Sequence, residues 1–227
     1  MSAPLRVLLV GAEGRMGRAV AAAATEDSSL TIVAGLERGD SLLSALEDCD
    51  VVIDFSTADA TEEVCRLCAG QGKPLVLGTT GHNAAQQAAV STAAEKVALV
   101  FAANFSIGVN VLFDLTKRAA ALLGTDFDLD VVELHHRTKK DAPSGTARRL
   151  LEILQEERGE NQVTAQSIRA GDIVGEHTVI FSGPGERLEL THRAGSRTTF
   201  AVGALRAARW VVGQPAGLYR MENVLGL

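Results

Sequence analysis

The chain has 227 residues, of which 46% are hydrophobic, which is enough apolar material for one large domain or two small ones. Its formal net charge of −6 argues against non-specific nucleic-acid binding, which requires a basic face. No apolar run approaches the roughly 18 to 20 residues of a membrane span. We therefore expect a soluble, cytoplasmic protein with neither a membrane nor a nucleic-acid partner.

Short apolar runs alternate with helical patterns through the first hundred residues. The runs lack the apolar–polar alternation of half-exposed strands, as is typical of strands covered on both faces. This order predicts βαβ units and a Rossmann-like, doubly wound parallel α/β sheet. The predicted strands span residues 5–10, 32–36, 51–55, 75–77 and 97–101, and the predicted helices residues 14–25, 41–46, 57–70 and 83–96.

The pattern changes after Ser106. Residues 109–123 and 144–157 have helical periodicity, whereas residues 128–134 and the stretch that begins at His177 alternate between apolar and polar positions. We therefore expect a second α+β domain, with a mixed or antiparallel sheet that leaves one face open. A helix around Trp210 and then a tail are predicted to complete the chain.

Three glycines directly follow the first predicted strand. Gly11, Gly14 and Gly17 open the first helix with the spacing G-x-x-G-x-x-G. Gly11 permits a tight turn, Gly14 lets the backbone approach a pyrophosphate, and Gly17 allows the helix to pack closely on the sheet. The helix N-terminus and Arg15 attract phosphates. The pattern predicts a dinucleotide site, and a plain strand–helix turn is the alternative.

The end of the second strand carries Glu37 and Arg38. Glu37 is placed to accept the ribose hydroxyls of NADH, and Arg38 to meet the 2′-phosphate of NADPH, although two solvated surface charges are the alternative. Ligands of such sheets bind beyond the carboxyl ends of the strands. Two further segments follow strands at that edge and are predicted to contact the cofactor, although an ordinary loop is the alternative for the first: Gly78, Thr79 and Thr80, and Ala102, Ala103, Asn104 and Phe105.

Residues 134–147, LHHRTKKDAPSGTA, concentrate positive charge in an acidic chain. Ser144 is predicted to cap a helix whose first N–H groups, at Gly145 and Thr146, suit an anion. Together with the preceding histidines and cations, this helix start predicts a pocket for one or two carboxylates. A basic surface loop beside a capped helix is the alternative.

His135 and Lys139 are the natural proton donors of this segment. A hydride added to a C=C or C=N bond requires a proton on the neighbouring atom, which a positioned side chain supplies. His177 and His192 are interpreted as structural residues. Arg197 is interpreted as a further contact for a substrate carboxylate, or as part of a salt bridge.

Three cysteines, an odd number, fit a reducing compartment. Cys65 and Cys68 have the spacing of a metal pair, but they lie in a helical pattern and no second pair completes a tetrahedral site. We interpret them as small apolar residues and predict no metal site.

Seven segments in family order resemble the 4-hydroxy-tetrahydrodipicolinate reductase (dihydrodipicolinate reductase) family. They span nearly the whole chain, and HHRTKKDAPSGTA is the most specific of the motifs. The segments are GAEGRMGRAV, DVVIDFST, GTTG, FAANFSIGVNVL, ELHHRTKKDAPSGTA, RAGDIVGEHTV and GERLELTHRAGSRTTFAVGA.

The resemblance implies reduction of an unsaturated cyclic dicarboxylate by NADH or NADPH in the diaminopimelate route to lysine, carried out by a homotetramer. It implies a dinucleotide-binding domain of residues 1–106 and 203–227, and a substrate-binding and oligomerisation domain of residues 107–202. The implied cofactor contacts are Gly11, Ala12, Glu13, Gly14, Arg15, Met16, Gly17, Glu37, Arg38, Gly78, Thr79, Thr80, Ala102, Ala103, Asn104 and Phe105.

His135 and Lys139 carry over from the family as catalytic residues, and the sequence does not choose which of them donates the proton. The substrate contacts are His136, Ser144, Gly145, Thr146 and Arg197.

Two other functions share part of this pattern. Another NAD(P)-dependent dehydrogenase, acting on an amino or hydroxy diacid, would share the glycine turn but would not need the histidine–lysine cluster. A non-catalytic dinucleotide-sensing regulator would lack the proton donors. The chain has both features, which favours the reductase.

Overall fold

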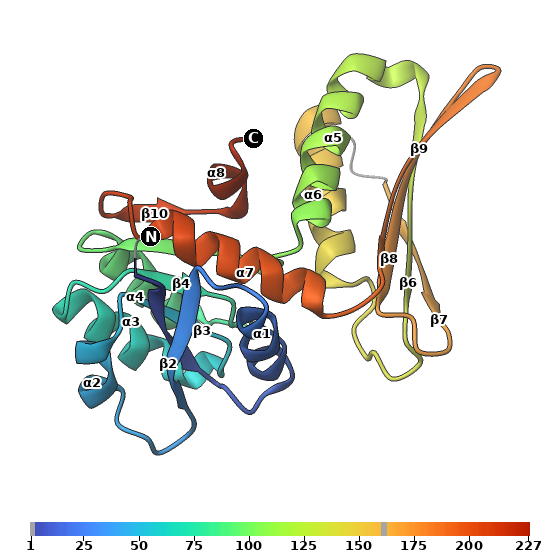
Figure 1. Ribbon diagram of the computed structural model, residues 1–227. Coiled ribbons are helices and arrows are strands. Elements are labelled where there is room, and N and C mark those ends of the chain that lie inside the picture. Colours follow the sequence, from blue (N-terminus) through green and yellow to red (C-terminus); the bar gives the residue numbers. More distant parts are fainter. Residues whose placement is uncertain (1–2, 160–162) are drawn as a thin grey trace. The chain divides into compact units, whose positions relative to one another are not determined.

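The computed structural model describes residues 3–159 and 163–227, and its helices and strands are labelled in Figure 1. The chain divides into two compact units: Met1–Ser106 with Thr198–Gly226, and Ile107–Arg197 with the terminal Leu227. The chain returns to the first unit at Thr198, where helix α7 (Thr198–Val211) begins, whereas the domain bounds given above resume at residue 203. Residues 1, 2 and 160–162 of the predicted domains lie outside the described residues.

The first unit contains a six-stranded parallel sheet with the order β10-β5-β4-β3-β1-β2. From β1 the chain first adds β2 on one side, and β3 and the later strands then add on the other side of β1. Ligands of such sheets bind at this switch point, where the strand order reverses. The predicted doubly wound sheet is confirmed. The strands are β1 (Leu5–Val10), β2 (Leu30–Leu36), β3 (Val51–Asp54), β4 (Leu75–Leu77), β5 (Ala98–Phe101) and β10 (Gly217–Tyr219).

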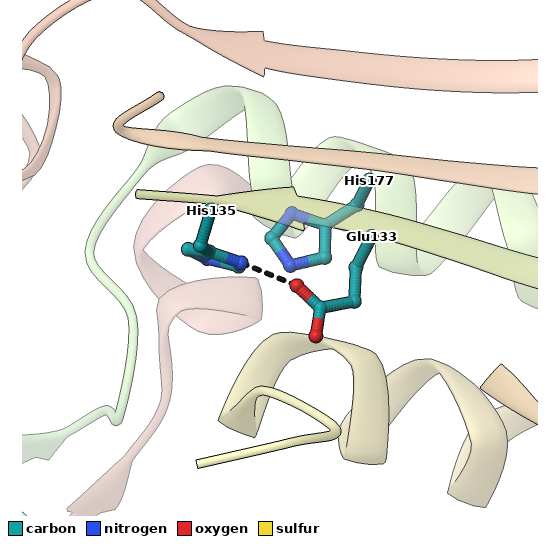
Figure 2. Close-up of side chains that lie close together, drawn as sticks. All are labelled: Glu133, His135 and His177. Carbon is teal, nitrogen blue, oxygen red and sulfur yellow. Dashed lines mark hydrogen bonds and ion pairs between the residues drawn. The ribbon is translucent and has the colours of Figure 1, made fainter. Parts of the chain in front are cut away.

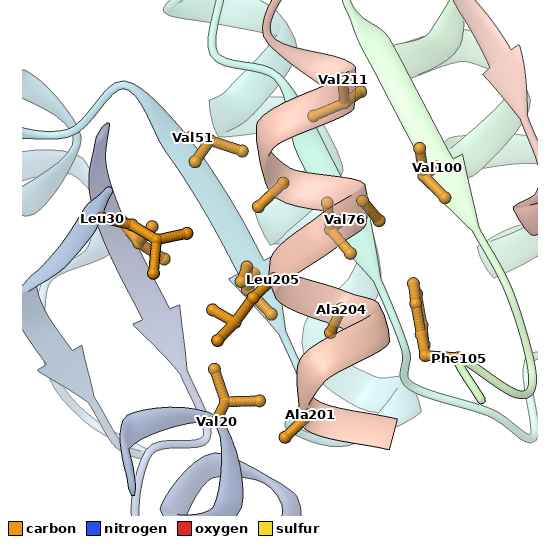
Figure 3. Packing of buried hydrophobic residues seen from close by; sticks show 14 of the residues in the cluster. Val20, Leu30, Val51, Val76, Val100, Phe105, Ala201, Ala204, Leu205 and Val211 are labelled. Carbon is orange, nitrogen blue, oxygen red and sulfur yellow. The ribbon is translucent and has the colours of Figure 1, made fainter. Parts of the chain in front are cut away.

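Helices cover both faces of this sheet. Val7 and Leu9 of β1 belong to one apolar cluster and Leu8 and Val10 to the other, which explains why the strand does not alternate. Figure 3 shows the first cluster gathered around α7. The first cluster includes residues of α1 (Arg15–Thr25), α7 and α8 (Met221–Leu225), and the second includes residues of α2 (Leu42–Ala45), α3 (Thr61–Gly70) and α4 (Ala84–Ala94).

The end of the chain is more ordered than the predicted tail. β10 pairs in parallel with β5, and Met221 and Val224 of α8 are buried in the first cluster. A three-residue strand and a five-residue helix are too short to produce a clear periodic pattern. Short 3-10 helices, likewise not predicted, occupy Leu46–Asp48, Ala58–Ala60 and Gly124–Asp126.

The second unit is a mixed four-stranded sheet packed against two helices. Its strand order is β7-β6-β8-β9, in which β7 runs parallel to β6 and the other pairs are antiparallel. Val131, Val179 and Phe181 of the sheet are buried with Leu150 and Leu154 of α6 in a third core. The elements are α5 (Ile107–Leu123), β6 (Asp128–His135), α6 (Gly145–Arg158), β7 (Ala165–Arg169), β8 (Gly175–Gly183) and β9 (Glu186–Ala194).

The predicted mixed sheet is therefore confirmed, although strand β7 was not predicted. Among the described residues, every helix is too short or too polar to cross a membrane.

Gly203 lets α7 approach the segment that follows β5. A Cβ at position 203 would lie 1.8 Å from the carbonyl oxygen of Phe105, so the backbone would have to move. Alanine stabilises a helix by about 1 kcal/mol relative to glycine, but this clash outweighs that gain. We expect Gly203→Ala to lower the free energy of unfolding by roughly 1 to 3 kcal/mol, measured by urea unfolding followed through Trp210 fluorescence.

Gly70, the last residue of α3, provides the matched control, because a Cβ there has no atom within 4 Å. Gly70→Ala should leave the free energy of unfolding unchanged or slightly higher. Equal losses in the two variants would contradict the role given to the contact at Gly203.

Candidate active site

The turn between β1 and α1 is built from closely approaching backbone. Gly11 has a φ of 78°, a conformation that favours glycine, and a Cβ there would lie 2.7 Å from the carbonyl oxygen of Phe55. A Cβ at Gly17 would lie 2.1 Å from the carbonyl oxygen of Gly11. Gly14 is the N-cap residue of α1, and it has no side chain to accept from the first N–H groups of the helix. Such a helix start suits a phosphate.

A cavity of about 510 Å³ opens beside this turn. Gly11, Gly14, Glu37 and Arg38 line it, together with Phe55 at the end of β3. These residues fit a dinucleotide, because the cavity joins a phosphate-binding turn to a carboxylate suited to ribose hydroxyls.

Hydrogen bonds join the end of β2 to the glycine turn. Glu37 Oε1 accepts from the backbone N–H of Glu13 at 2.5 Å. The backbone N–H of Glu37 donates to Oδ2 of Asp40 at 2.8 Å. Asp40, which was not predicted as a site residue, therefore shapes the loop that carries Arg38.

Phe55 brings the other predicted cofactor segments together. A Cβ at Gly78 would lie 2.1 Å from Cε1 of Phe55, so only glycine at position 78 lets the Phe55 ring pack against the backbone of this segment. The rings of Phe55 and Phe105 meet edge to face with centroids 5.6 Å apart. Sequence reasoning missed Phe55, although its position just after a buried strand was a usable signal. Of the other predicted cofactor residues, Thr79 is buried, Ala12, Met16, Ala102 and Asn104 are half-buried, and Glu13, Arg15, Thr80 and Ala103 are exposed.

A polar cluster lies on the core-facing side of the second sheet. Glu133 and His135 are two positions apart on β6, so their side chains point to the same face. In the strand register Glu133 pairs with His177 of β8, and His135 pairs with Arg169 of β7. Figure 2 shows Glu133, His135 and His177 pointing toward one another.

Glu133 is fully buried and is the central residue of this cluster. Arg169 donates to both carboxylate oxygens, to Oε1 at 2.7 Å and to Oε2 at 2.9 Å. The backbone N–H of Ser144 lies 3.3 Å from Oε1, and His135 Nδ1 bonds to Oε2. Burial raises the pKa of Glu133, but hydrogen bonds from Arg169, Ser167 and His135 outweigh it and lower the pKa to about 2. Glu133 is therefore ionised at neutral pH.

His135 is neutral at the same pH. Burial lowers its pKa, and this effect exceeds the opposing effect of the hydrogen bond to Glu133. An ionised carboxylate can only accept a hydrogen bond, so Nδ1 of His135 carries the ring proton. In the neutral ring the other nitrogen, Nε2, is then a hydrogen-bond acceptor.

His177 connects this cluster to the start of α6. Its Nε2 lies 3.0 Å from Oγ of Ser144, and Ser144 Oγ accepts from the backbone N–H of Ala147 at 3.1 Å. The predicted role of Ser144 as a helix cap is therefore confirmed. Burial lowers the pKa of His177 to about 3, which keeps its ring neutral.

Lys139 lies in the loop between β6 and α6. Its Nζ is 2.9 Å from Oδ1 of Asp141, and the hydrogen bond from Lys139 lowers the pKa of that carboxyl. The backbone carbonyl of Asp141 accepts from Nη2 of Arg169 at 2.6 Å. Arg169 thus joins the Lys139 loop to the carboxylate that contacts His135.

The predicted substrate-binding residues occupy several positions around this cluster. Half-buried His136 has its Nδ1 2.8 Å from Oγ1 of Thr138. In the first turn of α6, Gly145 is exposed and Thr146 half-buried, whereas exposed Arg197 lies in the separate loop after β9.

Glu133, His135 and His177 bring three possible metal-ligand atoms within 4.8 Å of one another. Arg169 engages both oxygens of Glu133, and its positive charge opposes a cation at that position. The chemistry of the group therefore favours control of a proton over metal binding. Cys65 and Cys68 are packed in the second core, and burial raises the pKa of the Cys65 thiol to about 12.

Sequence reasoning did not identify Glu133, Arg169 or His177 as site residues. The signal at Glu133 was a charged residue at an inward-facing position of an alternating strand, since a buried charge requires a partner. Arg169 could not be identified as that partner, because it lies 36 residues away on a strand that was not predicted.

Comparison with known proteins identifies the family. A model described as dihydrodipicolinate reductase, N-terminus, matches residues 5–105, and one described as dihydrodipicolinate reductase, C-terminus, matches residues 108–225. The chain belongs to the dihydrodipicolinate reductase family. The 4-hydroxy-tetrahydrodipicolinate reductase of Akkermansia muciniphila is 45% identical, with 98% of each chain covered. That of Halorhodospira halophila is 44% identical, covering 98% of this chain and 99% of the relative.

One solved structure is a dihydrodipicolinate reductase, and a second shares the fold. The dipicolinate-bound dihydrodipicolinate reductase from Paenisporosarcina sp. TG-14 is 25% identical with a TM-score of 0.83, covering 97% of this chain and 99% of that chain. GenD2 from gentamicin A biosynthesis, solved in complex with NAD, has a TM-score of 0.62 at 15% identity, covering 95% of this chain and 88% of that chain. At that identity the likeness shows the fold alone.

The buried neutral His177 should make the protein sensitive to acid. Its pKa is about 3 in the folded chain and about 6.5 in the unfolded chain, so between these values only the unfolded chain is protonated there. The free energy of unfolding therefore falls as the pH decreases, by at most about 1.4 kcal/mol per pH unit. We expect His177→Gln to show a smaller drop in melting temperature between pH 7 and pH 5 than the parent chain, measured by calorimetry.

His82→Gln is the control, because His82 lies in the first unit and bonds to Thr61. This variant should keep the pH dependence of the parent chain. An unchanged pH dependence in His177→Gln would show that the titration of His177 does not contribute.

Proposed function

We propose that the chain catalyses the NADH- or NADPH-dependent reduction of 4-hydroxy-tetrahydrodipicolinate, a cyclic dicarboxylate, in the cytoplasmic route to diaminopimelate and lysine. The supporting observation is a family match that includes both the Glu37 cavity and the cluster around His135. The Paenisporosarcina relative is solved with dipicolinate bound, which supports a cyclic dicarboxylate as the ligand class. Three free, buried cysteines suit a reducing compartment.

The first unit holds the cofactor in this proposal, and the bound nicotinamide supplies the hydride. The glycine turn at residues 11–17 binds the phosphates, Glu37 binds the ribose hydroxyls, and Arg38 binds a 2′-phosphate where one is present. Residues 78–80 and 102–105 surround the nicotinamide end, where Phe55 holds the two segments close to each other.

The second unit binds the two carboxylates of the substrate. The start of α6 offers the backbone N–H groups of Gly145 and Thr146, while Ser144 caps the helix and fixes its position. His136 and Arg197 add donor side chains. Because the two amide donors of α6 and the cation of Arg197 favour negative charge, they select a doubly negative ligand over a neutral one.

His135 and Lys139 are the two sources of the proton. The Lys139 ammonium has three donor hydrogens, one of which points to Asp141. His135 must first be protonated at Nε2, because its ring is neutral before the dianion binds. The negative charge of the substrate favours that protonation.

The open face of the second sheet supports a homotetramer. Val132, Leu134, Ile168 and Ile180 alternate with core-facing residues of their strands, so they point away from α6, and Ile168 is 45% exposed. An apolar sheet face of this kind is stabilised when a second copy covers it.

A coupled assay tests the proposed reaction. Freshly made product of dihydrodipicolinate synthase is supplied with NADH or NADPH, and the loss of nicotinamide absorbance is followed. The parent chain should oxidise the cofactor, and the double variant His135→Ala/Lys139→Ala should lose at least roughly 100-fold in kcat because both proton sources are gone. Lys117→Ala, which removes an exposed cation of α5, should retain full activity. An inactive parent chain, or an active double variant, would reject the function.

Arg38 should distinguish the two cofactors. A charge-assisted contact to a phosphate contributes about 1.5 to 3 kcal/mol, so we expect Arg38→Ala to weaken NADPH binding by roughly tenfold or more. Binding of NADH, which lacks the 2′-phosphate, should change much less. Titration of cofactor fluorescence measures both affinities, and equal losses would remove Arg38 from the 2′-phosphate.

A further inference from the structure

We propose that Glu133 and Arg169 form a positioning pair that fixes the tautomer of His135 and the place of the Lys139 loop, so that Nε2 of His135 is the ring nitrogen presented to the substrate. This inference rests on the proposed function for its catalytic consequence. The geometry of the pair does not depend on that function.

The first observation is that Glu133 has no contact with solvent and accepts at both carboxylate oxygens. The bidentate Arg169 prevents the carboxylate from rotating, because its two nitrogens bond to different oxygens. The Ser144 N–H, at the start of α6, lies on the Oε1 side. Contacts from two other elements of the fold therefore fix the orientation of the carboxylate, and with it the position of Oε2, the oxygen that faces His135.

The second observation concerns the ring of His135. Its Nδ1 must donate to Oε2, so a neutral ring cannot carry its proton on Nε2. The edge-to-face contact with His177, at a centroid distance of 5.1 Å, restricts the plane of the ring. A Cβ at Gly175 would lie 3.0 Å from Nε2, so a glycine at the start of β8 leaves room beside this nitrogen.

The third observation is that one guanidinium is linked to both proposed proton sources, to His135 through Glu133 and to Lys139 through Asp141. Nη2 of Arg169 donates to Oε1 of Glu133 at 2.7 Å and to the carbonyl oxygen of Asp141 at 2.6 Å. Asp141 in turn bonds to Nζ of Lys139 at 2.9 Å. Displacement of Arg169 would therefore disturb the positions of His135 and Lys139 together.

The charged and titratable groups around His135 come from several elements. Glu133 on β6 favours the protonated ring, whereas the charges of Arg169 on β7 and Lys139 in the following loop oppose it, and His177 on β8 is neutral. Glu133 is the one anion in this set of four, so its removal should make His135 harder to protonate.

The test compares the parent chain with Glu133→Gln, which keeps the shape of the side chain and removes its charge. We expect kcat to fall roughly 10- to 100-fold, the range found when partners that orient a functional histidine are removed. The KM values should change much less, because Glu133 is fully buried and its two oxygens already bond to groups of the chain. The limb of the kcat–pH profile that reports His135 should move to lower pH, since the charge that favours the imidazolium is gone.

The readout that is independent of activity is the ¹⁵N spectrum of histidine-labelled protein without substrate, with the His135 signal assigned by its absence in His135→Gln. The parent chain should show a protonated Nδ1 and an unprotonated Nε2, and Glu133→Gln should show a mixture of tautomers. A parent ring protonated at Nε2 would overturn the proposal even if the enzyme is active. Because the spectrum reports the tautomer of His135 and not activity, it still tests the positioning pair if the proposed reaction is rejected.

Gly175→Ala provides a second variant in case Glu133→Gln does not fold. It leaves the Glu133–Arg169 pair intact and places a methyl group beside Nε2, so kcat should fall while Nδ1 stays protonated. Gly213→Ala, where a Cβ meets no atom within 4 Å, is the control and should keep the kcat of the parent chain. Unchanged kcat and pH profile in Glu133→Gln, or unchanged kcat in Gly175→Ala, would contradict the proposal.

Discussion

The second unit depends on one buried charge. The Glu133 carboxylate has no contact with water, and an isolated ion in such a place is strongly destabilising. The fold compensates by directing Arg169 from β7, the ring of His135 from β6 and the N–H of Ser144 from the start of α6 toward its two oxygens. Strand pairing and helix position are therefore linked to the satisfaction of a single carboxylate.

This constraint also explains the protonation states around it. A carboxylate kept ionised by a guanidinium dictates which nitrogen of His135 is protonated. Burial keeps His177 neutral, so it can accept from the hydroxyl of Ser144 while that oxygen caps α6. A single connected set of hydrogen bonds thus stabilises the sheet, caps the helix and fixes the tautomer of a histidine. Each of these bonds is stronger in the buried, weakly polar interior than it would be in water.

The first unit uses a different means of recognition. Its glycine turn depends on the absence of side chains, because a Cβ at Gly11 or Gly17 would meet backbone atoms at less than 3 Å. The helix start that follows the turn leaves its first backbone N–H groups without a side-chain cap, which suits a phosphate. In the proposed function, the side chains at the end of β2 distinguish NADH from NADPH, and Glu37 of this segment is hydrogen-bonded to the glycine turn.

The sequence by itself determined the order of strands and helices from β1 to β5 in the first unit, the mixed sheet of the second, and the motifs around Gly11 and His135. These features follow from local periodicity, from glycine spacing and from a contiguous segment, all of which can be read along the chain. Tertiary structure alone decided that Glu133, Arg169 and His177 belong beside His135. Their meeting depends on the register of three strands, and β7 is short and carries a weak pattern. The register is set by the burial of side chains far apart in sequence, and no local pattern specifies it.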